Sequence, residues 1–152
     1  MRKDNVINFI FNVFTPLILG AIMGLLTKDD YSYLDSINRT IMVPNIVFPI
    51  VWSILYLLQG IWYHLYLKME NEPKIDTIYW LSILVNLLFM PLLFTFKQPI
   101  LAMIDVIVLI FLIGYLFFYS LGKKYKIGYL YLPYLLWLIV AFSLMLDILI
   151  HN

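Results

Sequence analysis

The stretch that most constrains the fold is residues 44–66, an apolar and aromatic run long enough to cross a bilayer. About 20 helical residues, at about 1.5 Å of rise each, span the roughly 30 Å hydrocarbon core. Large aromatic and amide side chains recur here every three or four residues and share one helical face: Phe48, Trp52, Tyr56, Gln59 and Tyr63. Aliphatic side chains occupy the opposite face: Ile50, Ile54, Leu57, Ile61 and Leu65. The division favours lipid on the aliphatic side and the protein interior on the aromatic side, where either helix packing or a ligand pocket would account for it.

The rest of the chain is equally apolar. Of its 152 residues, 64% are apolar and 12% are charged, which is outside the range of soluble globular domains. The apolar runs predict helices at about 5–26, 44–67, 77–96, 99–121 and 128–150. The sequence therefore predicts an all-α integral membrane protein, in which residues 1–152 form a single domain, a bundle of five transmembrane helices.

Several classes of function are disfavoured by composition. A net charge of +1 offers no electrostatic footprint for nucleic acid. The chain has no cysteine and only two histidines, far apart in sequence, so a metal site is not expected. No paired carboxylates, catalytic triad or phosphate-binding loop emerges, and no cofactor is required. Whether the protein is an enzyme stays open, because catalysis would need a bound pigment or tryptophan photochemistry.

Basic residues predict the orientation in the membrane. The N-terminus and the second and fourth connections carry seven of them: Arg2, Lys3, Lys68, Lys74, Lys123, Lys124 and Lys126. The other connections carry Lys28, Arg39 and Lys97. The excess of lysine and arginine on the cytoplasmic side of membrane proteins predicts a cytoplasmic N-terminus and an external C-terminus, for a protein of the plasma membrane.

Local features add further expectations. Pro16 is expected to bend the first helix, and the spacing of Gly20 and Gly24 allows close helix contact, either within the chain or in a homodimer. The longest connection, 27–43, carries Tyr31 and Tyr33 and is expected to act as a lid over a cavity. His64 and Asp147 are expected to reach the membrane surface. An interfacial aromatic belt is expected around the second connection: Trp62, Tyr63, Tyr66, Tyr79 and Trp80.

Three polar or amphipathic side chains fall near the middle of the membrane. Counting about 1.5 Å per residue from the helix ends puts Trp52, Asn86 and Trp137 within a few ångströms of the same depth. Buried indole and amide groups need hydrogen-bond partners, so a shared aromatic pocket or a satisfied helix contact would explain them. Asp105, inside the fourth predicted helix, is either a functional carboxylate or a locally paired one.

The order of residues within the predicted helices carries a resemblance to a known family. The second helix contains a spaced set of residues, Pro44, Phe48, Val51, Trp52, Leu55, Tyr56 and Gly60. Later helices contain Val85, Asn86, Phe89, Pro91, Phe94, Lys97, Gln98, Ala102, Asp105, Pro133, Tyr134, Trp137, Ala141 and Leu144. In these positions the chain resembles bacterial members of the tryptophan-rich sensory protein and translocator protein family, also known as TspO/MBR or the peripheral benzodiazepine receptor. It departs at Ile41, Val43 and Gln59, where the family pattern has Trp, Pro and Met.

The resemblance implies a membrane receptor that binds a flat hydrophobic ligand, a tetrapyrrole such as protoporphyrin IX, in an intramembrane aromatic pocket. It also implies light-dependent oxidative degradation of the porphyrin, with Trp52 and Trp137 as the catalytic candidates. The alternative is a transporter that carries porphyrin or sterol-like molecules across the membrane. The candidate ligand-binding residues are Tyr33, Phe48, Trp52, Tyr56, Asn86, Phe89, Leu93, Leu101, Asp105, Trp137, Ala141 and Leu144.

Overall fold

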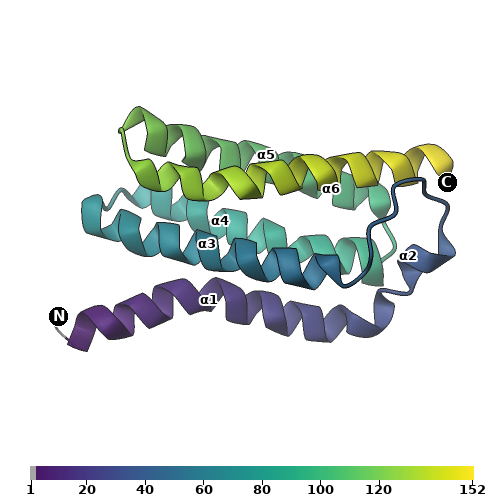
Figure 1. Ribbon diagram of the computed structural model, residues 1–152, viewed down its shortest axis with the longest axis horizontal. Helices are drawn as coiled ribbons and strands as arrows, with labels where there is room; N and C mark the ends of the chain where they lie inside the picture. The colour runs from purple at the N-terminus through teal and green to yellow at the C-terminus, as the bar shows by residue number, and fades with distance from the viewer. Residues whose placement is uncertain (1–2) are drawn as a thin grey trace.

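The computed structural model describes residues 3–152, with side chains from Val6 onward, and it is built from helices (Figure 1). The long helices are α1 (Lys3–Thr27), α3 (Val47–Met69), α4 (Pro73–Met90), α5 (Pro99–Gly122) and α6 (Leu132–His151). The short ones are η1 (Lys28–Asp30), α2 (Tyr33–Ser36), the π-helical η2 (Pro91–Thr95) and η3 (Lys126–Tyr131). Five segments of the described chain are long and apolar enough to span a membrane. The protein is an all-helical integral membrane protein, as its sequence predicts.

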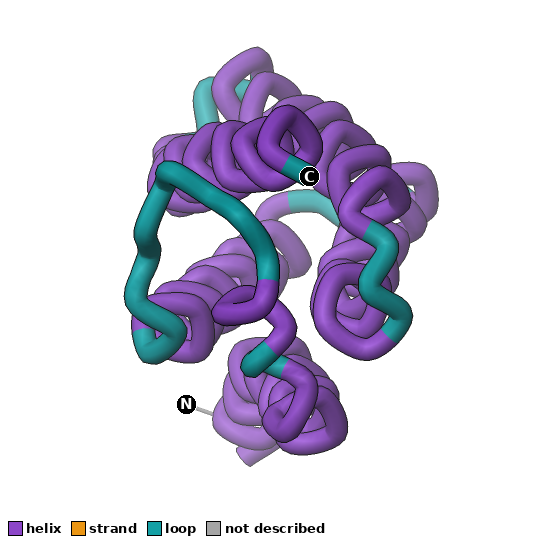
Figure 2. Tube along the Cα trace, turned by 90° about the vertical axis from the view of Figure 1, so that its right-hand side faces the viewer, coloured by secondary structure: helices purple, strands orange, loops and turns teal. Residues whose placement is uncertain are grey.

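The long helices alternate in direction, so successive turns fall at opposite ends of the bundle (Figure 1). Helix α1 packs mainly against α3 and less extensively against α4, whereas α5 packs against both α4 and α6. Viewed along the bundle, α1 lies at its edge and the connection from α2 to α3 arches across one end (Figure 2). The basic residues of the turns are thereby divided between the two ends as counted in the sequence, except that Arg2 lies outside the described residues. Which end of the bundle faces the cytoplasm stays a prediction.

Prolines account for most of the differences between predicted and observed helix ends. Helix α4 begins at Pro73, earlier than expected, because proline is well suited to the first turn, where no N–H bond is needed. At Pro91 the missing N–H interrupts the α-helical ladder, and the chain continues as the π-helical η2. Helix α6 begins later than expected, with Pro133 in its first turn.

The two faces of α3 are divided as its periodicity predicts. The aromatic and amide face is buried throughout: Phe48, Trp52, Tyr56, Gln59 and Tyr63. On the opposite face Ile50 and Ile54 are 53% and 51% exposed, so they are available to lipid. The one-sided pattern of the sequence therefore sets how α3 is rotated within the bundle.

The expected interfacial aromatic belt is mostly wrong. Trp62, Tyr66 and Tyr79 are fully buried, and the Trp62 and Tyr66 rings stack with centroids 5.1 Å apart. The Trp62 indole N–H donates to the Ser120 hydroxyl at 3.0 Å. Because α5 supplies this partner, the indole is satisfied inside the protein and needs no contact with the membrane surface. Of the belt residues, Trp80 is the one that reaches the surface, with 38% exposure.

A polar cluster closes the end of the bundle that holds the α3–α4 and α5–α6 turns. The Tyr119 hydroxyl donates to Glu70 Oε2 at 2.5 Å, and Lys123 Nζ lies 2.9 Å from Glu70 Oε1 and 3.4 Å from Glu72 Oε1. The hydrogen bond from Tyr119 and the ammonium of Lys123 lower the pKa of Glu70. The cluster fastens the α3–α4 turn to the end of α5.

Asp147 fastens the other end. One of its oxygens accepts the backbone N–H groups of Thr40 and Ile41, at 2.7 and 2.9 Å, and the other accepts the Thr40 hydroxyl and lies 3.1 Å from His151 Nδ1. Asp147 is 7% exposed, because its carboxylate is turned to the α2–α3 connection; its position at the membrane surface stays a prediction. His64 is likewise buried, with its ring against Phe9 at 5.0 Å. Asp147 holds the α2–α3 connection onto α6.

Two glycines set the distance between α1 and α3. A Cβ placed on Gly60 would lie 2.4 Å from the carbonyl oxygen of Val13, and one placed on Gly20 would lie 2.2 Å from the ring of Tyr56. The first neighbour is backbone and cannot move aside. Gly20 of the small-residue motif therefore serves contact within the chain, and a homodimer through other surfaces stays a prediction.

Replacing Gly60 should separate α1 from α3. We expect Gly60→Ala to lower the free energy of unfolding by about 1–3 kcal/mol, because the new methyl group meets the Val13 backbone. Gly114→Ala is the matched control, since a Cβ there has no neighbour within 4 Å, and it should be neutral or stabilising by up to about 1 kcal/mol. Chemical unfolding in mixed micelles, followed by circular dichroism, measures both, and equal destabilisation would contradict the close crossing.

Removing the Asp147 carboxylate should release the loop that it holds. In Asp147→Ala the amides of Thr40 and Ile41 lose their acceptor, so we expect their hydrogen exchange to accelerate by about tenfold or more. Asp35→Ala is the control. The Asp35 side chain lies in the same connection, is 67% exposed, and makes one weak ion pair with Arg39, at 4.0 Å. Unchanged exchange at Thr40 and Ile41 would show that other contacts hold the loop.

Candidate functional site: a pocket between α1 and α3

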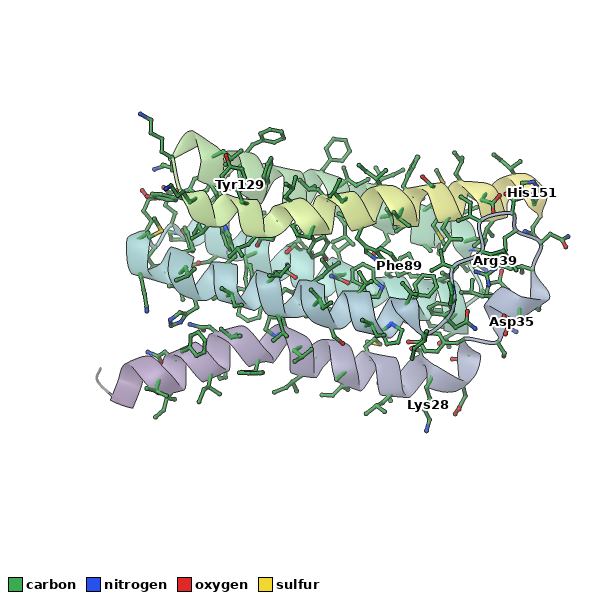
Figure 3. All side chains as sticks on the ribbon, viewed as in Figure 1. Lys28, Asp35, Arg39, Phe89, Tyr129 and His151 are labelled. Carbon is green, nitrogen blue, oxygen red and sulfur yellow. The ribbon has the colours of Figure 1, made fainter. Side chains whose placement is uncertain are left out.

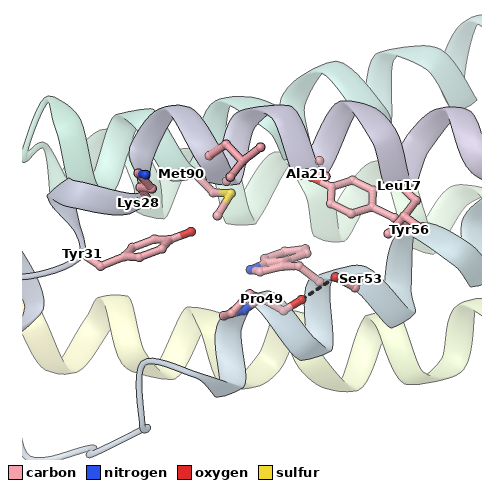
Figure 4. A pocket seen from close by; sticks show the side chains of 12 residues that line it. Leu17, Ala21, Lys28, Tyr31, Pro49, Ser53, Tyr56 and Met90 are labelled. Carbon is pink, nitrogen blue, oxygen red and sulfur yellow. Dashed lines mark hydrogen bonds between the residues drawn. The ribbon is translucent and has the colours of Figure 1, made fainter.

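A pocket of about 440 Å³ lies between α1 and α3 (Figure 4). This volume is within the range of small-molecule sites in proteins. Tyr31, from the segment after η1, reaches in from one end, and Met90 of α4 also borders the space. The lining residues are mostly apolar: Leu17, Gly20, Ala21, Gly24, Leu25, Lys28, Tyr31, Pro49, Trp52, Ser53, Tyr56 and Met90.

The pocket exists because small residues of α1 lie opposite large residues of α3. Gly20, Ala21 and Gly24 contribute almost no side-chain volume to the α1 wall. A Cβ on Gly24 would have its nearest neighbour 3.9 Å away, so the space beside it is open. The opposite wall is formed by Trp52 and Tyr56, one turn apart on the buried face of α3. The large aromatic side chains of α3 therefore face a surface of α1 that carries small side chains.

Behind Trp52 lies a packed aromatic cluster that continues into the bundle. The ring centroid of Trp52 lies 5.9 Å from that of Phe89, 6.1 Å from that of Tyr134 and 6.4 Å from that of Trp137. The planes of the two tryptophans are nearly perpendicular, an edge-to-face contact. Trp137 also contacts the ring of Phe48, at 6.0 Å. Trp52 is therefore the boundary between the open pocket and the closed aromatic core.

The amide of Asn86 is satisfied inside this core. The Tyr56 hydroxyl donates to Asn86 Oδ1 at 3.1 Å, and Asn86 Nδ2 donates to the Tyr134 hydroxyl. Each partner comes from a different helix, so one side chain of α4 joins α3 to α6. An unpaired amide would be costly at this depth, and the two tyrosines remove that cost.

The expected common cavity of Trp52, Asn86 and Trp137 is not an open space. The three residues do meet in one cluster, but Trp52 alone among them borders the pocket. Phe89 and Tyr134 fill the region between them, and Phe89 is 1% exposed, deep inside the bundle (Figure 3). The indole nitrogen of Trp137 is buried without a hydrogen-bond partner in the described chain.

The remaining candidate residues fall into three groups. Several are buried in the core behind the pocket, where they support its aromatic wall: Phe48, Phe89, Leu93, Ala141 and Leu144. Leu101 is 46% exposed, because the inward side of α5 is taken by Ala102 and Asp105 instead. Tyr33 lies near Lys97, whose ammonium is 5.9 Å from its ring centroid, and it does not border the pocket.

The α1 side of the pocket and Tyr31 are absent from the candidate residues that the sequence suggested. Tyr31, rather than Tyr33, reaches the pocket from the long connection. The signal for the α1 wall was present in the spacing of Gly20 and Gly24, which marks the narrow face of the helix. The sequence could not indicate that the space beside Gly24 is open, whereas the space beside Gly20 is filled by the Tyr56 ring.

Asp105 is a buried carboxylate on α5. It is 6% exposed, and its Oδ2 has no hydrogen-bond partner within residues 3–152. It does not border the pocket, so a direct contact with a molecule bound there is not supported. In the described residues no three histidine or acidic side chains lie close enough together to hold a metal ion.

Comparison with known proteins identifies the family of this chain. The model of the TspO/MBR family matches residues 12–150, which cover α3, α4 and α5 in full and most of α1 and α6. The chain is also similar to the tryptophan-rich protein TspO of Archaeoglobus fulgidus, with 25% identity over 158 aligned residues that cover 97% of this chain and 99% of that protein. The match extends along the whole bundle and includes both walls of the pocket. The chain therefore belongs to the TspO/MBR family.

Proposed function

We propose that this membrane protein binds a flat hydrophobic molecule, a tetrapyrrole of the protoporphyrin IX type, in the pocket between α1 and α3. The observation that carries the proposal is the indole of Trp52 on the wall of a largely apolar space of about 440 Å³. Aromatic side chains contribute large apolar contact area and stack on flat rings. The open space beside Gly24 leaves room for a planar molecule to lie between the two helices.

We further propose that the two tryptophans act as an electron-donor pair in light-dependent oxidation of the bound pigment. Trp52 borders the pocket and is in edge contact with Trp137, a partly buried side chain of α6 that does not border it. In this scheme the excited pigment takes an electron from the Trp52 indole and passes it to dioxygen, which becomes superoxide. The resulting electron hole is shared between Trp52 and Trp137 across their contact. The tryptophan radical cation then takes an electron from the ground-state pigment, which restores the indole, and the pigment radical cation combines with superoxide, so the net change is addition of one dioxygen to the pigment. No other residue of the pocket wall offers an equally oxidisable ring backed by a second one.

Filling the pocket tests the binding proposal. Gly24→Leu places a branched side chain into the open space beside Met90 and Tyr31, so we expect porphyrin affinity to fall at least about tenfold. Gly24→Ala is the matched control, since its methyl group meets only ordinary contacts at 3.9 and 4.0 Å and should leave binding nearly unchanged. Quenching of tryptophan fluorescence during a protoporphyrin IX titration measures the affinities. Equal binding by both variants would place the ligand elsewhere.

Conservative replacement of the tryptophans tests the photochemistry. Phenylalanine keeps a flat apolar ring but lacks the more easily oxidised indole, so Trp52→Phe with Trp137→Phe should retain most of the binding. Under illumination we expect the double variant to bleach bound pigment no faster than free pigment is bleached, whereas the wild type accelerates the loss. Trp80→Phe is the control, because that indole is 38% exposed and remote from the pocket lining. Bleaching at the wild-type rate in the double variant would contradict the donor role.

A further inference from the structure

The charged side chain of the pocket and its unpaired buried hydroxyl lie at the same end. Lys28 is the one charged residue of the lining, and Tyr31 follows three residues later (Figure 4). Both belong to the segment just after α1, at the end of the bundle where the long connection lies. Leu17 and Tyr56 lie at the opposite end of the pocket (Figure 4). The space therefore has an apolar depth and a cationic rim.

Neither rim group has an acceptor among the side chains that the structure describes. From Val6 onward the ion pairs involve Arg39, Lys123 and His151, and none of them includes the exposed Lys28 ammonium. Its neighbour Asp30 accepts instead from the Thr95 hydroxyl, at 2.7 Å. The Tyr31 hydroxyl is buried and also lacks a partner.

The Tyr31 ring is held in place by an edge contact with Phe94, with the centroids 4.6 Å apart. This contact fixes the direction of the hydroxyl, which points into the pocket (Figure 4). A buried donor that stays unpaired costs free energy, and a ligand that supplies an acceptor removes the cost. The rim thus offers a fixed neutral donor beside a flexible cationic one.

We propose that the pocket selects amphiphilic anions: molecules whose apolar body lies against Trp52 and whose carboxylate or phosphate group lies between Lys28 and the Tyr31 hydroxyl. This inference rests on the proposed binding function and specifies the class of ligand. The charged end remains at the rim, near the membrane surface, where an anion is not forced into hydrocarbon. A neutral molecule of the same shape offers weaker acceptors to the buried Tyr31 hydroxyl and no charge to pair with the Lys28 ammonium.

The test compares protoporphyrin IX, which carries two carboxylates, with its neutral dimethyl ester. The full chain is placed in nanodiscs of zwitterionic lipid, and both affinities are measured by fluorescence quenching. We expect the diacid to bind about five- to tenfold more tightly than the ester. Lys28→Gln should lower diacid affinity to about that of the ester, so that the ratio of the two affinities falls to about one, and Lys28→Arg should retain the preference.

Lys97→Gln is the control for general surface charge. Lys97 lies at the same end of the bundle, near Tyr33, but does not border this pocket. If Lys97→Gln weakens diacid binding as much as Lys28→Gln does, or if the wild type binds acid and ester equally, the anion preference is overturned while ligand binding itself stands. If the wild type binds neither compound, the proposed binding function fails and the inference fails with it.

A second experiment distinguishes a lipid phosphate from a free carboxylate as the anion that occupies the rim. Nanodiscs containing the anionic lipid phosphatidylglycerol are compared with the zwitterionic ones. Competition with the diacid that disappears in Lys28→Gln supports the proposal with a lipid phosphate as the natural occupant of the rim. Diacid binding that is unaffected by the lipid, yet still depends on Lys28, supports it with a free carboxylate ligand. Competition that is the same in wild type and Lys28→Gln overturns a role for Lys28 in anion selection.

Discussion

The hydrogen-bonded group of Tyr56, Asn86 and Tyr134 is the interaction on which the rest of the structure depends. Within a bilayer a polar side chain finds no water, so its partners must come from the protein. Asn86 is satisfied only when α3 and α6 both turn a tyrosine towards α4. This requirement fixes the rotation of α3 and therefore points Trp52, one turn from Tyr56, at the boundary between core and pocket.

Because of that rotation, the two sides of α3 are packed differently. Towards α4, α5 and α6, the side chains of α3 pack against aromatic rings. Hydrogen bonds on this side satisfy the buried polar groups, which would otherwise destabilise the fold. Towards α1 it meets glycines, which bring the backbones together at Gly60 and leave a gap beside Gly24. The pocket is the space left where a rigid aromatic surface faces a helix with small side chains, and Tyr31 partly closes its end.

The sequence predicts which face of α3 is buried, but it does not predict where an open space remains. The buried face of α3 follows from periodicity within one helix, and equal depth correctly brings Trp52, Asn86 and Trp137 into one cluster. Whether that cluster encloses a void depends on Phe89 and Tyr134, whose positions relative to Trp52 no single-helix pattern contains. Leu101 and Tyr33 were misplaced for a related reason. A shift of one residue turns a helical side chain by about 100°, and in a loop no period exists to fix the direction.

The position of the pocket at the edge of the bundle has a consequence for how its contents are supplied. Leu25 of its lining is 68% exposed, so on the α1 side the pocket borders the outer surface of the bundle, which the acyl chains cover. Under the proposed binding function, a hydrophobic solute arrives by lateral diffusion within the lipid. Its occupancy of the pocket then follows the mole fraction of solute in the membrane, so a compound's partition coefficient contributes to its apparent affinity in addition to its fit to the pocket.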